Sequence, residues 1–371
     1  MMKLKELVNY LENIVPPAFQ ESYDNSGIQI GDFEGDINSV LLSLDVTEEI
    51  IDEADSKGCR LIITHHPLIF QPLKNISGKT FVEKIVLKAI KKNISIYSMH
   101  TNLDIVRGGV SYRMAEKLQL ENIEEMIPLG NKLLKLVVFV PINHAEAVRD
   151  AIFNAGAGHI GNYDRCSYNI RGEGTFRAGP ESDPFTGESG REHTEEEIRV
   201  ETVLPEHLKN NVIRAMISAH PYEEVAYDLY RIENTMPGAG LGCIGELKSS
   251  ITDSELIERL GKLFEARVIR HTQLTGKKVK KLAVMGGSGG AYINKAISAG
   301  ADAYVTADIK YHTFFEAATT NLLFIDIGHY ESEKPALGIL YELITKKFPK
   351  FAVLFSEINT NPVNYSQVWQ K

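Results

Sequence analysis

The chain has 371 residues, of which 43% are hydrophobic and 24% charged, and its formal net charge at pH 7 is −9. A chain of this length usually exceeds one hydrophobic core, so two or three domains are expected. The acidic balance argues against a generic nucleic-acid binder, and no apolar run approaches the length of a membrane span.

The N-terminus and the cysteines indicate a cytoplasmic protein. The opening "MMKLKELVNYLENIVPP" alternates charged and apolar residues at helical spacing, which predicts a surface helix and not a signal peptide. The three cysteines, Cys59, Cys166 and Cys243, are few, odd in number and far apart. This pattern is typical of a reducing compartment and predicts no disulfide framework.

Short apolar runs and helical patterns alternate between Val40 and about Leu120. Strands are predicted at 40–45, 60–64 and 94–99, with helices at 47–58 and 79–92 between them. Thr47 is a predicted helix cap and Gly58 a predicted stop. This order predicts parallel strands with right-handed crossovers.

The middle of the chain, about 131–234, has a different order of elements. It reads strand, helix, strand, strand, helix, strand, which is the split-βαβ or ferredoxin-like signature. The predicted segments are 132–141, 143–156, 167–176, 196–205, 206–220 and 223–232. A 17-residue loop, 178–194, is longer than compact domains usually contain, which predicts a mobile or functional segment.

The α/β pattern returns after about Pro237. Strands are predicted at 281–287, 301–308, 322–329 and 351–356, and helices at 291–300, 311–320 and 334–348. The predicted fold class is therefore α/β, with one domain built from both chain ends (1–130 and 235–371). An α+β module, 131–234, interrupts it.

Three predicted strands end in histidines and carboxylates. "LIIT" is followed by His65 and His66, "ISIYS" by His100 and Asp104, and "LLFID" by His329 and Glu333. Because ligands bind beyond the carboxyl ends of strands in open α/β sheets, these groups are candidates for one site. The alternative is that they are strand-end and cap residues that meet solvent. Three such strand ends favour a site with two metal ions.

Spacing refines the metal prediction. His329 and Glu333 are four residues apart where a helix should begin, so both can lie on one face. His65 and His66 are adjacent, and on an extended strand they would point to opposite faces and serve two different ions. Three imidazoles with two carboxylates suit zinc, iron, manganese or cobalt better than calcium or magnesium.

"THHPLIF", "SMHTNLD", "VTADIKYHTFFEA" and "DIGHYESE", in this order, resemble the NIF-three-like family, also known as GTP cyclohydrolase 1 type 2 homologues. "PPAFQESYDNSGIQIGD" resembles the opening signature of that family. The resemblance covers essentially the whole chain. It implies two divalent ions per chain, zinc first, and a toroidal homohexamer of two stacked trimers. The implied metal ligands are His65, His66, Asp104, His329 and Glu333. His100 and His312 are implied to be catalytic or structural groups beside the ligands.

The middle module resembles PII-type or CutA-type signalling proteins through "GAGHIGNYDRCSYNIRGEGTFRAG" and "AHPYEEVAYDLY". Since shorter members of the family lack this module, we expect it to be dispensable for metal binding. In PII-like proteins small effectors bind between subunits, so the resemblance permits a regulatory ligand.

Three classes of function follow. The first is a metal-dependent hydrolase for a nucleotide or related small molecule, with His100 or His312 as general acid or base. The second is a non-catalytic metal-binding or regulatory scaffold. The third, a ring-shaped DNA-associated protein, depends only on the implied toroid and conflicts with the net charge. "MGGSGGAY" (Met285 to Tyr292) forms either a phosphate subsite or a tight turn that needs glycine.

Overall fold

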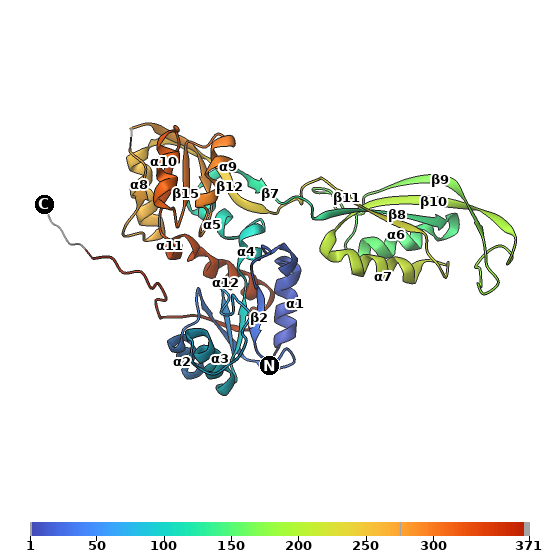
Figure 1. Cartoon of the computed structure of the whole chain (residues 1–371), viewed down its shortest axis with the longest axis horizontal. Coiled ribbons are helices and arrows are strands. Elements are labelled where there is room, and N and C mark those ends of the chain that lie inside the picture. The colour runs from blue at the N-terminus through green and yellow to red at the C-terminus, as the bar shows by residue number, and fades with distance from the viewer. Residues whose placement is uncertain (1, 275, 367–371) are drawn as a thin grey trace. The chain divides into compact units, whose positions relative to one another are not determined.

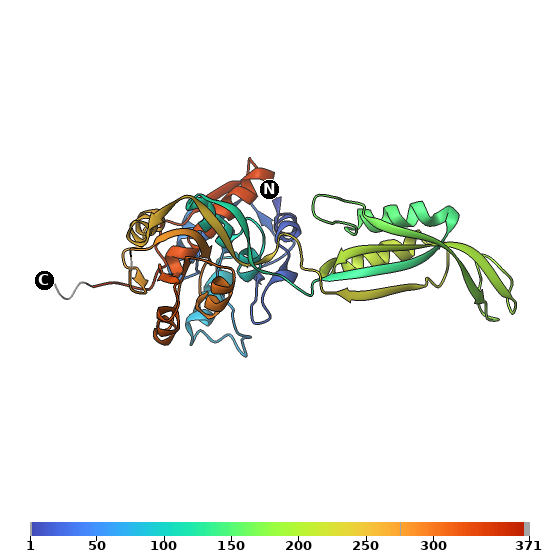
Figure 2. The ribbon, with the colours of Figure 1, turned by 90° about the horizontal axis from the view of Figure 1, so that it is seen from above.

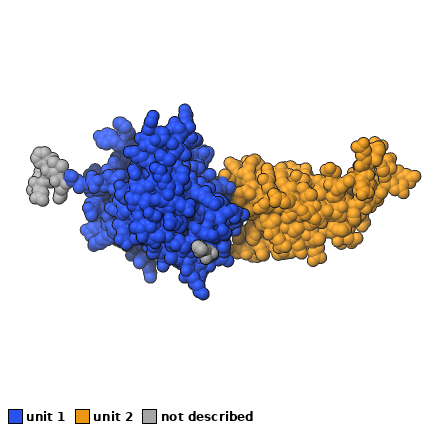
Figure 3. Space-filling model, turned by 90° about the horizontal axis from the view of Figure 1, so that it is seen from below, with its two compact units in different colours: residues 1–127, 238–371 blue, residues 128–237 orange. Residues whose placement is uncertain are grey.

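We describe the protein from a computed structural model in which residues 2–274 and 276–366 are placed. The chain forms two compact units, shown in different colours in Figure 3. Unit 1 comprises residues 1–127 and 238–371, and unit 2 comprises residues 128–237. The two ends of the chain therefore fold together, and the middle segment folds separately.

The first sheet of unit 1 has the strand order β17–β4–β5–β6–β2 (Figure 1). Its strands are β2 (Gly27–Ile30), β4 (Ser39–Ser43), β5 (Leu61–Thr64), β6 (Ser95–Ser98) and β17 (Ala352–Phe355). All neighbours pair in parallel except β2, which runs antiparallel to β6. β4 and β5 are buried along their whole length, as expected for parallel strands covered on both faces.

The second sheet of unit 1 has the order β13–β16–β15–β14–β12–β7. Its strands are β7 (Leu120–Pro128), β12 (Gly240–Thr252), β13 (Arg270–His271), β14 (Lys278–Val284), β15 (Ala303–Thr306) and β16 (Leu323–Asp326). β14, β15 and β16 are parallel to one another, whereas β12 pairs antiparallel with β14 and β13 pairs antiparallel with β16. A further small sheet joins β1 (Met2–Lys3) to β3 (Asp36–Ile37).

Three helices of unit 1 begin after a threonine that caps them, at Thr47, Thr80 and Thr252. The Thr47 side chain accepts a hydrogen bond from the Ile50 amide, and Thr252 forms a capping box with Glu255. The helices are α1 (Leu4–Ile14), α2 (Glu48–Ser56), α3 (Phe81–Lys91), α4 (Thr101–Ile105), α5 (Val110–Lys117), α8 (Asp253–Phe264), α9 (Ile293–Ser298), α10 (Tyr311–Ala318), α11 (His329–Glu333) and α12 (Pro335–Lys347). Their apolar faces pack on the two sheets and form the cores of unit 1.

Unit 2 is an antiparallel four-stranded sheet with two helices on one face (Figure 2). Its elements are β8 (Leu133–Pro141), α6 (Ala145–Asn154), β9 (Ser167–Arg177), β10 (Glu192–Pro205), α7 (Lys209–Ala219) and β11 (Tyr227–Ile232). The strand order is β11–β8–β10–β9, so the first and third strands of the unit lie in the centre. This order is the one that the strand and helix pattern of the sequence predicts.

The structure differs from the sequence-based expectation at several places. The two chain ends form two separate sheets, and each end contributes one strand to the sheet built mainly by the other, namely β7 and β17. β7 and β12 are not predicted from the sequence. The predicted loop 178–194 is shorter, because Glu192 already pairs with Arg177. In the part of the chain that is placed, no helix is both long and apolar enough to cross a membrane.

Candidate metal centre

The strand ends of unit 1 bring the predicted site residues together. His65 and His66 follow β5. After β6, His100 precedes the first residue of α4, and Asp104 lies within that helix. After β16, His329 and Glu333 are the first and last residues of α11. The three strands belong to both sheets of unit 1. The residues that follow β5, β6 and β16 thus come together from the carboxyl ends of strands in two sheets, where ligands bind in α/β proteins.

Glu333 is the centre of the cluster. Its Oε2 atom lies 2.7 Å from His66 Nε2 and 2.9 Å from His329 Nε2. Its Oε1 atom lies 3.8 Å from His65 Nε2, which in turn is 3.7 Å from Asp104 Oδ1. One ring nitrogen each of His65, His66 and His100 also lie within 4.8 Å of one another. Nitrogen and oxygen atoms from the five predicted ligands and His100 thus converge.

All four imidazoles are held by an acceptor at Nδ1, which leaves Nε2 available for the cluster. The acceptor of His65 is the Met99 carbonyl at 2.8 Å. The other three acceptors are carboxylates, at 2.7 to 2.8 Å: Asp45 for His66, Asp24 for His100 and Asp308 for His329. Such carboxylate–imidazole pairs orient a histidine and make it a better metal ligand.

Two buried atoms of the cluster have no hydrogen-bond partner among the residues that the structure places. They are His65 Nε2 and Asp104 Oδ1. The His65 side chain is fully buried, and its Nδ1 faces the Met99 carbonyl. Because a carbonyl oxygen accepts a hydrogen bond, the N–H of the neutral ring lies at Nδ1, and Nε2 carries a lone pair. A buried lone pair beside a buried carboxylate is costly unless a cation or donor satisfies both. This donor set fits a divalent metal ion.

The electrostatics of the cluster favour positive charge. Burial disfavours the charged imidazole of His66, but its bonds to Asp45 and Glu333 outweigh burial and raise the pKa to about 10. Burial likewise opposes protonation of His329, yet Glu333 and Asp308 raise its pKa to about 9. Burial also opposes ionisation of Glu333, but its contacts with His329 and His66 and the nearby charge of His65 hold its pKa well below the usual range.

The glycine-rich loop after β14 supports Glu333. Gly287 has φ +63, and a Cβ there would lie 2.1 Å from Glu333 Oε1. The amides of Gly286, Gly287 and Gly289 donate to Ser111, Ser332 and Thr306 hydroxyls respectively. Because these N–H groups are already bound within unit 1, the loop is better explained by close packing than by a phosphate subsite.

The structure corrects one expectation about the histidines and gives the place of His312. His65 and His66 do not lie on an extended strand, because β5 ends at Thr64, so both nitrogens can face the same cluster. His312 is exposed on α10, and within the placed residues its ring contacts are with Tyr311 and Phe315. The structure therefore brings His100 to the cluster and does not bring His312 there.

The sequence reasoning missed the three supporting carboxylates, Asp24, Asp45 and Asp308. Asp24 is the most extensively bound, since it also accepts from the Thr101 amide and hydroxyl and from the Ser26 hydroxyl. These bonds outweigh burial and hold the pKa of Asp24 well below its ordinary value. Asp45 and Asp308 follow β4 and β15, so the rule that identified the ligands, polar residues after parallel strands, would also have found them.

Comparison with known proteins identifies the family. The chain belongs to the Duf34/NIF3 (NGG1p interacting factor 3) family, whose sequence model matches residues 2–362. It is 40% identical over 363 residues to the GTP cyclohydrolase 1 type 2 homolog of Halalkalibacterium halodurans, covering 97% of this chain and 98% of the relative. The Bacillus subtilis homolog of the same name is 39% identical, with 97% and 98% covered. A crystal structure of a Bacillus cereus protein related to NIF3 superposes with a TM-score of 0.84 at 40% identity, covering 98% of this chain and 99% of that one.

Proposed function

We propose that the chain binds two divalent cations in this cluster and acts as a metal-dependent hydrolase on a nucleotide or related small molecule. The observation that carries the proposal is the pair of buried, unpartnered atoms His65 Nε2 and Asp104 Oδ1, next to a carboxylate shared by two imidazoles. His65, His66, Asp104, His329 and Glu333 would hold the ions. Zinc fits this mixture of imidazole and carboxylate, and iron, manganese and cobalt are alternatives.

The chemistry of the site supports hydrolysis. Divalent cations of this kind lower the pKa of water and polarise a carbonyl or phosphoryl oxygen. His100 is our candidate for moving a proton, because Asp24 binds its Nδ1 and one of its ring nitrogens lies within 4.8 Å of those of His65 and His66. His312 was the other predicted acid or base, and its exposed place on α10 gives it no such support.

Aromatic rings beside His100 support a planar substrate. The Phe70 ring centroid lies 6.3 Å from that of His100, and the Tyr23 ring lies 6.3 Å from Phe70. Tyr23 and Phe70 are 59% and 42% exposed, so their faces are open to a ligand. Exposed rings next to a polar cluster suit a nucleobase, which stacks on aromatic side chains.

Elemental analysis of untagged protein, purified without chelator, tests the proposal. We expect about two metal atoms per chain in the wild type and a loss of metal in Glu333→Ala and His66→Ala. His159→Ala, at an exposed histidine of unit 2, is the matched control and should keep its metal. A wild-type value near zero that added zinc, iron, manganese or cobalt does not restore would refute the metal centre. A metal-loaded protein without activity on a nucleotide panel would favour the scaffold alternative.

We further propose that unit 2 is a PII-like or CutA-like module and that the chain assembles as a homohexamer of two trimers in the cytoplasm. The antiparallel strand order β11–β8–β10–β9 supports a PII-like or CutA-like fold for unit 2. The three free cysteines support a cytoplasmic location. Light scattering should give about six times the 41.4 kDa chain mass. A monomer at micromolar concentration would contradict the assembly.

A further inference from the structure

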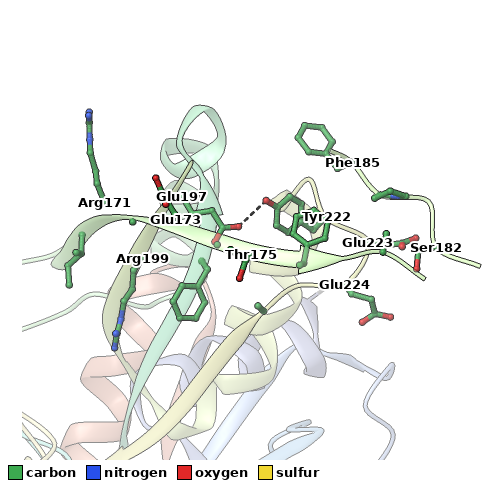
Figure 4. Close-up of a pocket in the computed structure, with 18 residues that line it drawn as sticks. Arg171, Glu173, Thr175, Ser182, Phe185, Glu197, Arg199, Tyr222, Glu223 and Glu224 are labelled. Atoms are coloured by element: carbon green, nitrogen blue, oxygen red, sulfur yellow. Dashed lines mark hydrogen bonds between the residues drawn. The ribbon is translucent and has the colours of Figure 1, made fainter. Parts of the chain in front are cut away.

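Unit 2 contains a cavity of about 560 Å³ that the proposed metal centre does not use (Figure 4). Phe139 of β8, several residues of β9, and Glu197 and Arg199 of β10 line it, together with Phe185 from the loop 178–191 and Tyr222 before β11. The volume lies within the usual range for small-molecule sites. All of the lining belongs to one compact unit of one chain.

The cavity opens on the face of the sheet that the helices leave uncovered. Val138 and Val140 of β8 are buried in the core formed with α6 and α7. Phe139, between them, therefore points to the opposite face, since side chains alternate along a strand. Arg199 and Ile170 are aligned with Phe139 across the neighbouring strands and share that face.

Glu197 is a buried carboxylate in this cavity, only 8% exposed. Its Oε1 atom accepts a hydrogen bond from the Tyr222 hydroxyl at 2.9 Å, drawn as the dashed line in Figure 4. Among the residues that the structure places, no lysine, arginine or histidine forms a salt bridge with Glu197, and Arg199 pairs with Glu201 instead, at 2.9 Å. A largely buried carboxylate without a cationic partner in its own fold is available to a cationic ligand.

Two glycines of β9 shape the space around Glu197. A Cβ at Gly174 would lie 2.3 Å from Glu197 Oε2, so that oxygen occupies room that any side chain would take. Gly172 lies directly opposite Glu197 in the strand register, and a Cβ there would meet nothing within 4 Å. Space for a ligand is therefore left open beside the carboxylate.

Aromatic rings complete the site. The Tyr222 ring centroid lies 6.2 Å from Phe176 and 6.2 Å from Phe185, and Phe185 is 55% exposed. Further acidic residues, Glu173, Glu223 and Glu224, also line the cavity. Aromatic faces next to a carboxylate attract an ammonium group, and their apolar area suits a hydrocarbon body.

We propose that this cavity binds a protonated organic amine with an apolar or aromatic body. The ammonium group donates to Glu197, whose charge it neutralises, and the body packs between Tyr222, Phe176 and Phe185. The site is distinct from the metal centre, since every lining residue lies in unit 2 and every predicted ligand in unit 1.

Calorimetric titration of the full-length protein with phenethylammonium tests the proposal. Phenylacetate has the same ring with the opposite charge, and tetramethylammonium has the charge without N–H donors or a ring. We expect saturable binding of phenethylammonium at concentrations up to about 10 mM, and at least tenfold weaker binding of both comparators. No binding of phenethylammonium, or equal binding of phenylacetate, would overturn the proposal.

Three variants locate the binding. Glu197→Gln keeps the shape of the side chain and should weaken phenethylammonium binding at least tenfold. Gly172→Leu places a side chain in the open space and should abolish binding while metal content stays at the wild-type value. Glu146→Gln, at an exposed residue of α6, is the control and should bind like the wild type. Thermal unfolding confirms that each variant is folded, and unchanged affinity in folded Glu197→Gln would disprove the role of the carboxylate.

Discussion

Each imidazole in the metal-centre cluster is bound at Nδ1, and for three of them the acceptor is a carboxylate outside the predicted ligand set. Asp45 and Asp308 lie 2.8 and 2.7 Å from His66 and His329. They fix the ring orientation and leave Nε2 to face the cluster, where our proposal gives it the role of metal ligand. Removing their charge should therefore weaken metal binding without removing a ligand.

We predict that Asp45→Asn and Asp308→Asn each lower zinc affinity about 10- to 100-fold. Competition with a chromophoric chelator measures this affinity. Asp36→Asn is the matched control, since Asp36 is an exposed residue whose partner is Lys3 at the surface of unit 1. If both variants retain wild-type affinity, the carboxylates do not tune the histidines.

Gly287 allows the glycine-rich loop to approach Glu333, and its φ of +63 disfavours any other residue. We predict that Gly287→Ala destabilises the protein by about 1–3 kcal/mol and displaces the Glu333 carboxylate, with loss of metal. Gly338→Ala provides the opposite case, because Gly338 lies in α12 with open space around its Cβ position. Gly338→Ala should stabilise the protein by about 0.5–1 kcal/mol. Urea unfolding of both variants measures the two changes in the free energy of unfolding.

At the residue scale, the sequence predicts which histidines and acids lie close together, but not which carboxylate binds each imidazole. His65, His100 and His329 are identifiable because each follows a strongly apolar strand. The supporting role of Asp24 is not, since it precedes β2 and reaches His100 only through the fold. His312 differs from these three, since its role is implied only by the family motif, and its side chain is exposed on α10.

At the element scale, α3 depends on a carboxylate that binds the turn before it. Glu83 accepts from the Ser77 amide at 2.9 Å, the Ser77 hydroxyl at 2.7 Å and the Lys79 amide at 3.1 Å. These hydrogen bonds lower the pKa of Glu83 from 4.5 to about 2. Because the folded-state pKa is lowered, this stabilisation is complete above pH 4.5 and is lost as the pH falls toward 2.

Glu83→Gln should therefore lose stability at pH 6 and show a smaller further loss on acidification to pH 3 than the wild type. Urea unfolding at both pH values measures the difference. Glu121→Gln, at an exposed residue of β7, should follow the wild-type pH profile. A parallel pH dependence in Glu83→Gln and the wild type would show that other groups govern the acid response of this region.

The elements that the sequence predicts well are the parallel strands, whose short apolar runs are buried on both faces. β7 and β12 escape prediction for physical reasons. β7 carries three exposed or half-exposed acids, Glu121, Glu124 and Glu125, and β12 contains Gly240, Gly242 and Gly245. Their pairing is favoured by contacts within the second sheet and not by strand propensity.

At the scale of the whole molecule, unit 2 joins unit 1 through two strands that lie side by side. β7 and β12 are neighbours in the second sheet, and the Ile127 carbonyl lies 2.6 Å from the Cβ position of Gly240. Just beyond, the Met236 amide donates to the Leu129 carbonyl at 2.7 Å. The two chain segments are therefore close enough for a two-residue hairpin turn to connect them.

We predict that replacing residues 130–235 with Asn-Gly gives a folded protein with the metal content of the full chain. All five predicted ligands and their supporting carboxylates lie in unit 1, and among the placed residues its three hydrophobic clusters described above contain none from the deleted segment. Elemental analysis and thermal unfolding of the shortened protein measure metal content and folding separately. The shortened protein should also lose phenethylammonium binding, since the cavity is removed with unit 2. A folded product without metal would show that unit 2 completes the metal centre, and retained amine binding would place that site elsewhere.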